Sequence, residues 1–385
     1  MADEAALIEV DGRELSISHP SKVFFSDRGE TKLDLVKFYL SIGEPFLRAM
    51  QGRPTMLQRF PDGAEGKSFY QKRVPAGTPD WVQTTEVLTP NGTPSNALVL
   101  ADMAHVVWAV NLGCLGFHPW PYQAATPEQT DELRIDLDPT PGITFEQLRE
   151  AAFNVKTLFD ELNIPSFPKT TGNKGIHIYV RVASASNAAG PTSSPGQSVL
   201  STDRQAGSGA SGWDSYHVRF AAVAIARELE RRHPTTMTAA WWKEERGQRV
   251  FVDFNQNAPH KTVFGPWCVR SRAGAQVSTP LTWDELKTIT IDECTIATVP
   301  EMVARRGDPW QAMNDQPQSL EPLMEMHKAD RASGLMDAPW PPVYPKQPDE
   351  PPRVAPSRAK KPPATEATAT ATANEGLVKS YPPGE

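Results

Sequence analysis

The chain has 385 residues, with 39 Lys and Arg against 46 Asp and Glu, so its formal net charge is -7. This length suits one large or two modest domains, and the negative charge excludes a global basic field, so any nucleic-acid surface must be a local patch. The three cysteines form no C-x-x-C pair, which argues against a structural zinc site and a disulfide scaffold. We expect no signal peptide and no membrane contact, because no apolar run approaches the ~18 residues of a spanning helix.

The N-terminal region predicts short elements. After a strand-like segment, apolar residues recur at helical spacing over residues 33–49, which predicts a helix with weak points at Gly43 and Pro45. Residues 97–115 are apolar and predict a strand followed by a helix. The prolines of residues 116–121, G-F-H-P-W-P, should then stop any regular element.

Residues 51–73 are locally basic, and aromatic residues such as Phe69 and Tyr70 are interleaved with charges such as Arg59 and Lys72. Basic and aromatic side chains together can hold a nucleic-acid strand by phosphate contact and base stacking. A solvated loop with its aromatic residues in the core explains the same composition, and this stretch alone favours that simpler interpretation.

Residues 131–139, D-E-L-R-I-D-L-D-P, alternate with period two, which predicts a strand with one buried face. The opposite face carries Asp136 and Asp138, whose like charges would repel each other in a purely structural sheet. A pair of hard cations, Mg²⁺ or Mn²⁺, would reverse that effect and is the usual machinery for in-line attack on a phosphate. A strand end with solvated aspartates is the alternative, and a lone D-x-D motif would favour it.

A helix follows, because Thr144 and Gln147 form a capping-box pattern ahead of an apolar stripe. With a strand on either side, this helix predicts an α/β arrangement. The second strand carries K-T-T-G-N-K-G-I-H, whose glycine turn offers N–H groups and an ammonium group to an anion. Thr171, Lys174 and His177 could therefore converge on a triphosphate, and a glycine hairpin with a satisfied histidine is the alternative.

A third carboxylate lies further along the chain. Residues 249–257 predict a strand with Asp253 among bulky apolar neighbours, where a metal shared with Asp136 and Asp138 would give this carboxylate a partner. Basic residues follow at Lys261, Arg270 and Arg272. On a strand, the last two would share one face.

Low-complexity segments alternate with helices in the rest of the chain. Residues 182–212 are almost all small and polar, and predict a mobile surface insertion. Helical spacing predicts helices within residues 216–232 and 283–303. Residues 341–385 are rich in proline and contain an Ala-Thr run, and predict a disordered tail.

Taken in order, the motifs resemble the polymerase module of bacterial ligase D, within the archaeo-eukaryotic primase superfamily. They are S-H-P-S-K-V-F, E-T-K, G-R-P-T-x-x-x-R-F-P-D-G, F-H-P-W-P, R-I-D-L-D-P, T-G-N-K-G-I-H and V-D-F-N-Q-N, followed by K-T and R-S-R. The resemblance covers residues 14–303. It implies an α+β fold (mixed α/β), with a primase-type catalytic sheet flanked by helices. The implied domain spans residues 1–310, with an N-terminal subdomain in 1–125 and the catalytic motifs in 126–310.

The resemblance also assigns site residues in three groups. The catalytic, metal-binding carboxylates match Asp136, Asp138 and Asp253. The residues that hold the incoming nucleotide match Thr171, Lys174, His177, Arg270, Arg272 and His118, and we add the basic residues Lys261 and Arg59. The DNA contacts match Lys22 and Lys32, which grip a downstream 5′-phosphate, together with Phe69, Tyr70, the neighbouring Lys72, and His19, which stands where many relatives have Asn.

The implied activity is that of a template-dependent DNA/RNA polymerase, a nucleotidyltransferase that extends primers and fills short gaps at DNA breaks. It implies two Mn²⁺ or Mg²⁺ ions, NTP or dNTP substrates and a preference for ribonucleotides. The implied setting is non-homologous end joining in the bacterial cytoplasm, at the nucleoid, with DNA and end-joining proteins such as Ku as partners. Because no ligase K-x-D-G motif or nuclease module follows, we expect a stand-alone polymerase. A de novo primase and a weakly catalytic DNA-end-binding module are the alternatives.

Overall fold

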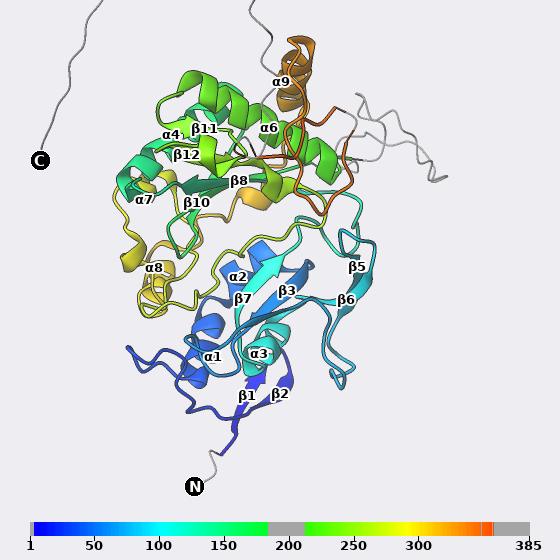
Figure 1. Cartoon of the computed structure of the whole chain (residues 1–385). Helices are drawn as coiled ribbons and strands as arrows, with labels where there is room; N and C mark the ends of the chain where they lie inside the picture. The colour runs from blue at the N-terminus through cyan, green and yellow to red at the C-terminus, as the bar shows by residue number, and fades with distance from the viewer. Residues whose placement is uncertain (1–3, 184–211, 348, 356, 358–385) are drawn as a thin grey trace, which may run out of the picture. The chain divides into compact units, whose positions relative to one another are not determined.

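The computed structural model describes residues 4–183, 212–347, 349–355 and 357. Most of the insertion predicted at residues 182–212 therefore lies outside the described residues, as does the chain beyond residue 357. One compact unit ends at Arg353 and holds all the helices and strands below. Figure 1 shows these elements in two halves, the first in blue and cyan and the second mainly in green to orange.

The N-terminal half contains a hairpin of β1 and β2, a sheet of strand order β4-β3-β6-β5 in which β7 also pairs with β3, and the helices α1 to α3. Edge-to-face contacts of Tyr39 with Phe46 and Phe117 join α1, α2 and β7. The elements are β1 (Ala6–Val10), β2 (Arg13–Ile17), α1 (Lys32–Ser41), α2 (Gly43–Met50), β3 (Pro54–Arg59), β4 (Phe69–Gln71), β5 (Thr84–Leu88), β6 (Pro94–Val99), α3 (Met103–Asn111) and β7 (Cys114–Pro119).

Two predictions for this half are confirmed with small shifts. The helix over residues 33–49 is present as α1 and α2, divided at Ile42 beside the predicted weak point Gly43, and Pro45 falls in the first turn of α2, where its missing N–H is not needed. Regular structure stops at the prolines of residues 116–121, because β7 ends at Pro119, where no further ladder bond is lost. The strand and helix predicted within residues 97–115 are confirmed as β6 and α3.

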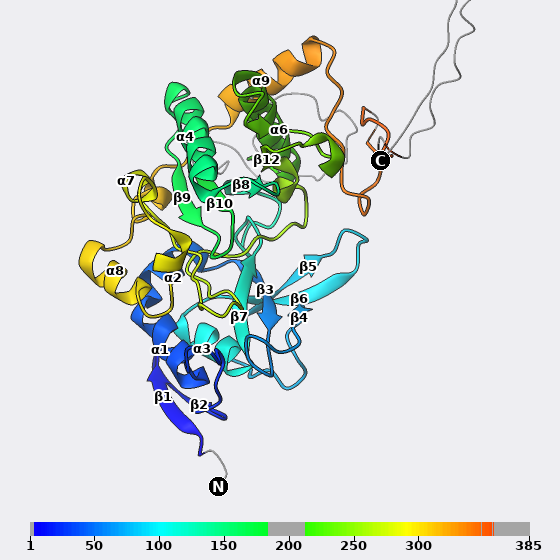
Figure 2. The same cartoon turned by 60° about the vertical axis from the view of Figure 1, so that its left-hand side comes forward.

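The second half is built on a sheet of strand order β11-β12-β8-β10-β9. Helices α4 and α6 lie side by side over one face of this sheet (Figures 1 and 2), and β8, α4 and β9 form a crossover with β10 between the two strands. The capping box of Thr144 and Gln147 is confirmed at the start of α4. The bounds are β8 (Glu132–Pro139), α4 (Phe145–Glu161), β9 (Phe167–Thr170), β10 (Ile176–Arg181), α6 (Ser215–Arg232), β11 (Met237–Thr238) and β12 (Val250–Asp253).

The alternation of β8 places Leu133, Ile135 and Leu137 in the core, as predicted. The opposite face is covered as well, because the N-terminal half packs against it. Arg134 on that face is only 1% exposed and donates to the carbonyl of Pro119, at the end of β7. The polar face of β8 therefore looks into the space between the two halves and not into bulk solvent.

Two segments expected to be strands are partly turns. The strand of residues 249–257 stops at Asp253, and Phe254–Asn257 form a 3₁₀ turn. Arg270 and Arg272 do not lie on one strand, because the chain reverses beside them in a turn closed by the bridge between Val269 and Val277. The helices predicted within residues 216–232 and 283–303 are present as α6, and as α7 (Trp283–Leu286) with the start of α8 (Val299–Arg306).

The described chain stays packed well beyond residue 310. Helix α9 (Glu321–Ala332) lies along α6, and the predicted start of a disordered tail at residue 341 is wrong for residues 341–347 and 349–353. Tyr344 in this segment is buried and donates from its hydroxyl to the carbonyl of Pro259 over 2.5 Å. Average composition hid this docking, because a few aromatic and charged anchors are spread among many prolines. No helix in the described ranges is long and apolar enough to span a membrane.

Candidate active site

Four polar residues form a single row across the second sheet. The strand registers pair Asp253 with Asp136, Asp136 with His177, and His177 with Lys169. Directly paired residues point to the same side of a sheet, so this row runs along one face from β12 to β9. Asp138, two residues beyond Asp136, lies on the same face of β8.

Asp136, Asp138 and Asp253 each present a carboxylate oxygen, and these three oxygens lie within 4.8 Å of one another. Burial and the charges of the other two aspartates raise the pKa of Asp253 to about 7. Burial raises the pKa of Asp136 to about 6, and burial together with Asp136 raises that of Asp138 to about 6. Three neighbouring carboxylates whose pKa values are all raised are a set that a divalent cation would stabilise.

These donors fit hard cations. Carboxylate oxygens are the ligands that Mg²⁺ and Mn²⁺ prefer, and the triad contains no softer ligand atom. Asp253 is held ready by its own neighbours: the Asn255 backbone N–H donates to its Oδ1 over 2.9 Å, and Gln256 Nε2 donates to its Oδ2 over 2.9 Å. We conclude that the triad can bind a divalent metal, with Asp253 fixed before the metal arrives.

The turn between β9 and β10 is organised by Thr171. Its hydroxyl donates to the carbonyl of Gly175 and accepts from the backbone N–H groups of Gly175 and Asn173. Gly172 has a φ of +66°, and a Cβ there would lie 2.9 Å from Cγ of Arg270, so both backbone and space require glycine. Lys174 is exposed at the tip of the turn.

His177 lies beside the metal site in its neutral form. Its Nε2 lies 3.1 Å from Oδ1 of Asp136. Burial lowers the pKa of His177 well below its usual value, with help from the charges of Lys169 and Arg270. Its Nδ1 is buried and has no hydrogen-bond partner among the described residues, so this atom is left for a substrate or a water molecule.

Arg270 and Arg272, which each lie 99 residues further along the chain than the residue they bond, contact the turn between β9 and β10. Arg270 donates from Nε to the carbonyl of Thr171 over 2.8 Å, and its guanidinium group lies 3.4 Å from the ring centroid of Phe264. Arg272 donates to the side chain of Asn173. The predicted convergence of these two residues is therefore present without the predicted strand.

A cavity of about 290 Å³ joins these parts. It is lined by Asp136, Asp138, Pro139, Thr171, Asn173, Lys174, Gly175, His177 and Arg270. Arg59 and Lys261, two predicted nucleotide contacts, do not line it. Arg59 instead donates to the carbonyl of Leu112 and to Gln71 in the N-terminal half. Lys261 directly follows His260, whose pKa is lowered by burial and also by the charge of Lys72.

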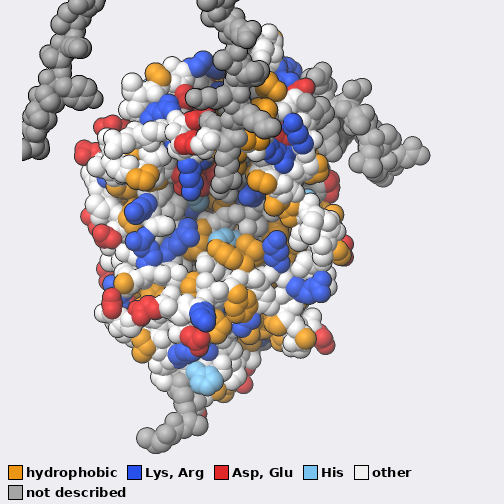
Figure 3. All heavy atoms as spheres, viewed as in Figure 1, with side chains coloured by type: hydrophobic (Ala, Val, Ile, Leu, Met, Phe, Trp, Pro, Cys, Tyr) orange, Lys and Arg blue, Asp and Glu red, His pale blue; other side chains and the backbone are white. Residues whose placement is uncertain are grey.

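The N-terminal half brings the Tyr70 ring to the side of the cavity. Phe69 and Tyr70 on β4 are 45% and 58% exposed, but as successive strand residues they point to opposite faces, and Phe69 packs on Arg59. The Tyr70 ring lies edge-on to that of His118 at 5.3 Å, and burial lowers the pKa of His118 to about 3. The Nε2 atom of His118 is buried without a partner in the described part of the chain. Figure 3 shows histidine, basic and hydrophobic side chains gathered around a hollow between the two halves.

Lys22 and Lys32, the predicted contacts to a DNA end, lie in the N-terminal half, in and next to the segment between β2 and α1. The backbone N–H of Lys32 donates to the carbonyl of Lys22, so the predicted turn does bring the two residues together. Their ammonium groups differ. Lys22 is partly exposed and donates to the carbonyl of Pro61, whereas Lys32 is 6% exposed and donates to the carbonyls of Ser18 and Asn111. His19 is exposed with a φ of +49°, a conformation that Asn and His adopt more readily than most residues.

Two residues of the site escaped the sequence analysis. Lys169 is fully buried in the row described above, and burial lowers its pKa well below the usual value. Only its alternation with Thr171 in K-T-T-G pointed to the active face. Arg246 lies close enough to Asp138 and Asp253 for their charges to act on its pKa, and its guanidinium group lies 3.5 Å from the ring centroid of Phe251. Nothing in its sequence neighbourhood singled it out.

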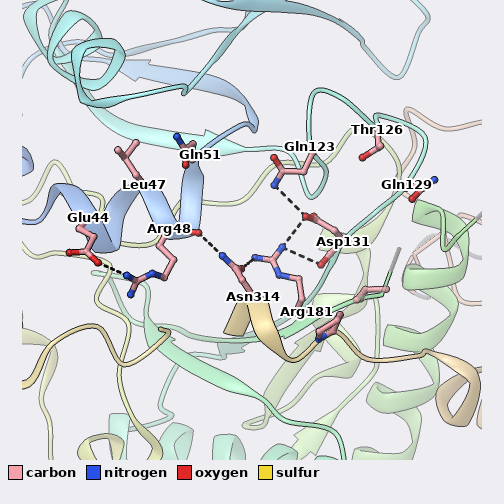
Figure 4. Close-up of a pocket in the computed structure, with 12 residues that line it drawn as sticks. Glu44, Leu47, Arg48, Gln51, Gln123, Thr126, Gln129, Asp131, Arg181 and Asn314 are labelled. Atoms are coloured by element: carbon pink, nitrogen blue, oxygen red, sulfur yellow. Dashed lines mark hydrogen bonds and ion pairs between the residues drawn. The ribbon is translucent and has the colours of Figure 1, made fainter. Parts of the chain in front are cut away.

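A larger cavity, of about 910 Å³, lies at the other end of β8 and β10 (Figure 4). Asp131 and Arg181 in its wall are joined over 2.9 Å, and Arg53, which immediately precedes β3, donates to Asp131 with two bonds of 2.7 and 2.9 Å. Arg53 also pairs with Glu132 over 2.9 Å. None of the predicted site residues lines this cavity, so size does not mark the active site here. Its buried ion network instead joins the two halves.

The chain matches the sequence model of the LigD primase-polymerase domain over residues 31–197 and 208–310. It is 29% identical over 272 residues to the multifunctional non-homologous end joining protein LigD of Mycolicibacterium smegmatis, covering 70% of this chain and 32% of the relative. It is 30% identical over 298 residues to the LigD protein of Pseudomonas aeruginosa, covering 76% of this chain and 32% of the relative. The chain thus spans about a third of the length of these relatives.

The fold has a solved counterpart. The polymerase domain of Mycobacterium tuberculosis ligase D, in complex with DNA, superimposes with a TM-score of 0.67 and 25% sequence identity. The match covers 79% of this chain and 99% of the solved chain.

Proposed function

The chain belongs to the LigD primase-polymerase domain family, and on that premise we propose that it is a template-dependent nucleotidyltransferase that extends primers and fills short gaps at DNA breaks. The observation that carries the proposal is the triad of Asp136, Asp138 and Asp253, whose ligand atoms lie within 4.8 Å of one another beside a basic cavity. Two divalent cations there would activate the primer 3′-hydroxyl and neutralise the leaving pyrophosphate.

The residues around the triad have separate tasks in this proposal. Lys174 and Arg270 line the cavity and supply positive charge to the triphosphate of an NTP or dNTP, while Arg272 supports the turn through Asn173. His177, neutral and next to Asp136, orients that carboxylate and offers its free Nδ1 to the substrate. Gln256 keeps one oxygen of Asp253 in a fixed direction.

The opposite wall of the hollow would carry the nucleic acid. The exposed ring of Tyr70 would stack on a base of the template, Phe69 would contact DNA from the other face of β4, and Lys72 follows after Gln71. Lys22 and His19 would meet the downstream 5′-phosphate. The Mycobacterium tuberculosis relative was solved in complex with DNA, which supports DNA binding by this fold. We further propose Mn²⁺ as the preferred ion, ribonucleotides as preferred substrates, and action in non-homologous end joining at the nucleoid, with Ku as a partner.

The test is extension of a gapped duplex with labelled ATP and dATP, comparing Mn²⁺ with Mg²⁺. We expect addition of one or a few nucleotides by the wild-type protein, and no detectable addition by Asp136→Ala, whose DNA binding should be nearly intact because phosphate contacts supply most of the affinity. Products on a single-stranded template without primer would identify a primase instead. DNA binding without any extension would identify an end-binding module.

A further inference from the structure

The C-terminal strap, residues 337–347 with 349–353, lies against the half of the molecule that carries the aspartate triad. It lies beyond residue 310, where the match to the family model ends. Its anchors are deeply buried: Trp340 is 1% exposed, Tyr344 7% and Glu350 3%. Glu350 accepts from the backbone N–H of Trp340 over 2.7 Å and pairs with Arg353, so the strap is also braced internally.

The strap grips one residue of α6. Arg219 is fully buried, and its Nη1 pairs with Asp337 at 3.1 Å while its Nη2 donates to the carbonyl of Ala338 over 2.8 Å. The guanidinium group lies 3.8 Å from the ring centroid of Trp340. A buried guanidinium group needs a counter-charge and acceptors for all its donors, and the strap supplies most of them.

The remaining donor of Arg219, its Nε, contacts the turn that follows Asp253. Its Nε donates to Oδ1 of Asn255 over 2.8 Å, and Nδ2 of Asn255 donates to the carbonyl of Pro339 over 2.9 Å. Both ends of this amide are therefore held, one by α6 and the other by the strap. The backbone N–H of the same Asn255 donates to Oδ1 of Asp253 over 2.9 Å.

Asp253 depends on such support because of its place in the sheet. It is the last residue of β12, and the chain leaves the ladder immediately after it in the turn Phe254–Asn257. Backbone pairing on both sides fixes the positions of Asp136 and Asp138 on the central strand β8. For Asp253 it fixes only the backbone that precedes the residue, because the backbone that follows has left the sheet. The position of the following turn decides where the Asp253 carboxylate points.

We propose that the strap is a positioning element for the metal site. Asp337 and Trp340 fix the position of Arg219, and Arg219 and Pro339 together fix the side chain of Asn255. Asn255 in turn orients the carboxylate of Asp253 towards the metal. The inference rests on the proposed function to the extent that Asp253 is a metal ligand. On this inference, the strap beyond the family domain contributes to metal binding as well as to the stability of the fold.

The experiment measures Mn²⁺ binding directly in the full-length chain, by electron paramagnetic resonance of free Mn²⁺ and by the thermal shift that Mn²⁺ produces. Asp337→Asn should raise the half-saturating Mn²⁺ concentration several-fold, less than the ~10-fold or more caused by removing a direct partner of a metal ligand, because Asp337 acts through Arg219 and Asn255. Binding to a gapped DNA without metal should be unchanged. Trp340→Phe, a milder change, should move the Mn²⁺ concentration in the same direction by a smaller factor.

The matched control is Asp330→Asn. Asp330 is a buried aspartate on α9 that pairs with Arg231 of the same helix α6 over 2.9 Å, at a distance from the catalytic motif along the helix. The Asp330→Asn variant should have a lower melting temperature, as Asp337→Asn does, but its half-saturating Mn²⁺ concentration should equal that of the wild type. If both variants melt earlier and both bind Mn²⁺ as the wild type does, the strap only packs and the inference is overturned. If the wild type and Asp136→Asn bind Mn²⁺ alike, the metal assignment itself fails, and with it the proposed function.

Discussion

Asp136 and Asp253 face each other as directly paired residues on β8 and β12. Like charges at directly opposed positions destabilise an antiparallel pair, and burial adds to the cost. The fold tolerates this arrangement at the proposed metal site, so removing one charge should stabilise the metal-free protein while it abolishes the proposed nucleotide transfer.

Asp253→Asn should therefore raise the stability of the metal-free protein at pH 8. The folded-state pKa of Asp253 is raised to about 7 from 3.8, so the penalty of ionising it is absent below the lower value and complete above the higher one. We expect a gain on the order of 1–2 kcal/mol at pH 8 that shrinks as the pH falls from 7 towards 4. Urea unfolding in EDTA at pH 8 and pH 5 measures it. A variant no more stable than the wild type at pH 8 would contradict the electrostatic argument.

Gly172→Ala should weaken triphosphate binding. The substitution places a Cβ 2.9 Å from Arg270 Cγ and 3.0 Å from the backbone N of Ser278, and it imposes a φ of +66° on alanine. We expect a loss of stability of about 1 kcal/mol or more, and a several-fold higher KM for NTP. Gly92→Ala is the control, because Gly92 has a φ of +78° and open space around it. Equal KM values for the two variants would show that the turn does not position the phosphates.

Lys22 and Lys32 should respond differently to alanine. Lys22→Ala should erase the preference for a gap with a 5′-phosphate over a 5′-hydroxyl and leave the melting temperature unchanged, because its ammonium group is partly exposed. Lys32→Ala should lower stability by about 1–3 kcal/mol, because the carbonyls of Ser18 and Asn111 lose a buried donor. Binding to both gaps at fixed salt, with thermal melts, separates the two effects. A wild-type protein without the phosphate preference would rule out the downstream clamp.

Truncation should locate the end of the folded unit. A chain that stops after Arg353 should melt as the full-length protein does, since the compact unit ends there. A chain that stops after Met336 loses Asp337 and Trp340 and leaves Arg219 buried without its counter-charge, so it should melt well below the full-length protein. Calorimetry of the two chains compares them. Equal melting temperatures would mean that residues 337–353 contribute nothing to stability.

Periodicity predicted the strand that carries Asp136 and Asp138, because alternation alone determines which residues share a face. It did not determine which residues lie side by side on neighbouring strands. The register that aligns Asp253, Asp136, His177 and Lys169 depends on how β12, β10 and β9 pair, so Lys169 was missed even though its motif was noticed. The same limitation placed Arg59 and Lys261 at the triphosphate, because a basic residue near a motif in sequence can point elsewhere in space.

The resemblance to a known family added His118, and it assigned roles to Asp253 and the aromatic pair, which the residue pattern had offered only beside a simpler alternative. It did not extend to α9 or to the C-terminal strap, which pack on α6. The proline-rich composition from residue 341 onward predicted disorder. A few buried side chains, such as Trp340 and Tyr344, were enough to overcome the ordering cost of their neighbours.

The buried ion network of Arg53 with Asp131 and Glu132 has a consequence for binding energy. Arg53 belongs to the half that carries Tyr70 and His118, and its partners Asp131 and Glu132 lie at the start of β8, the strand that carries two of the proposed metal ligands. The two walls of the hollow are therefore fastened together when the chain folds. The conformational entropy of bringing the two walls face to face is lost when the chain folds. Binding of a nucleotide or a DNA end therefore does not lose it again, and the affinity is not reduced by it.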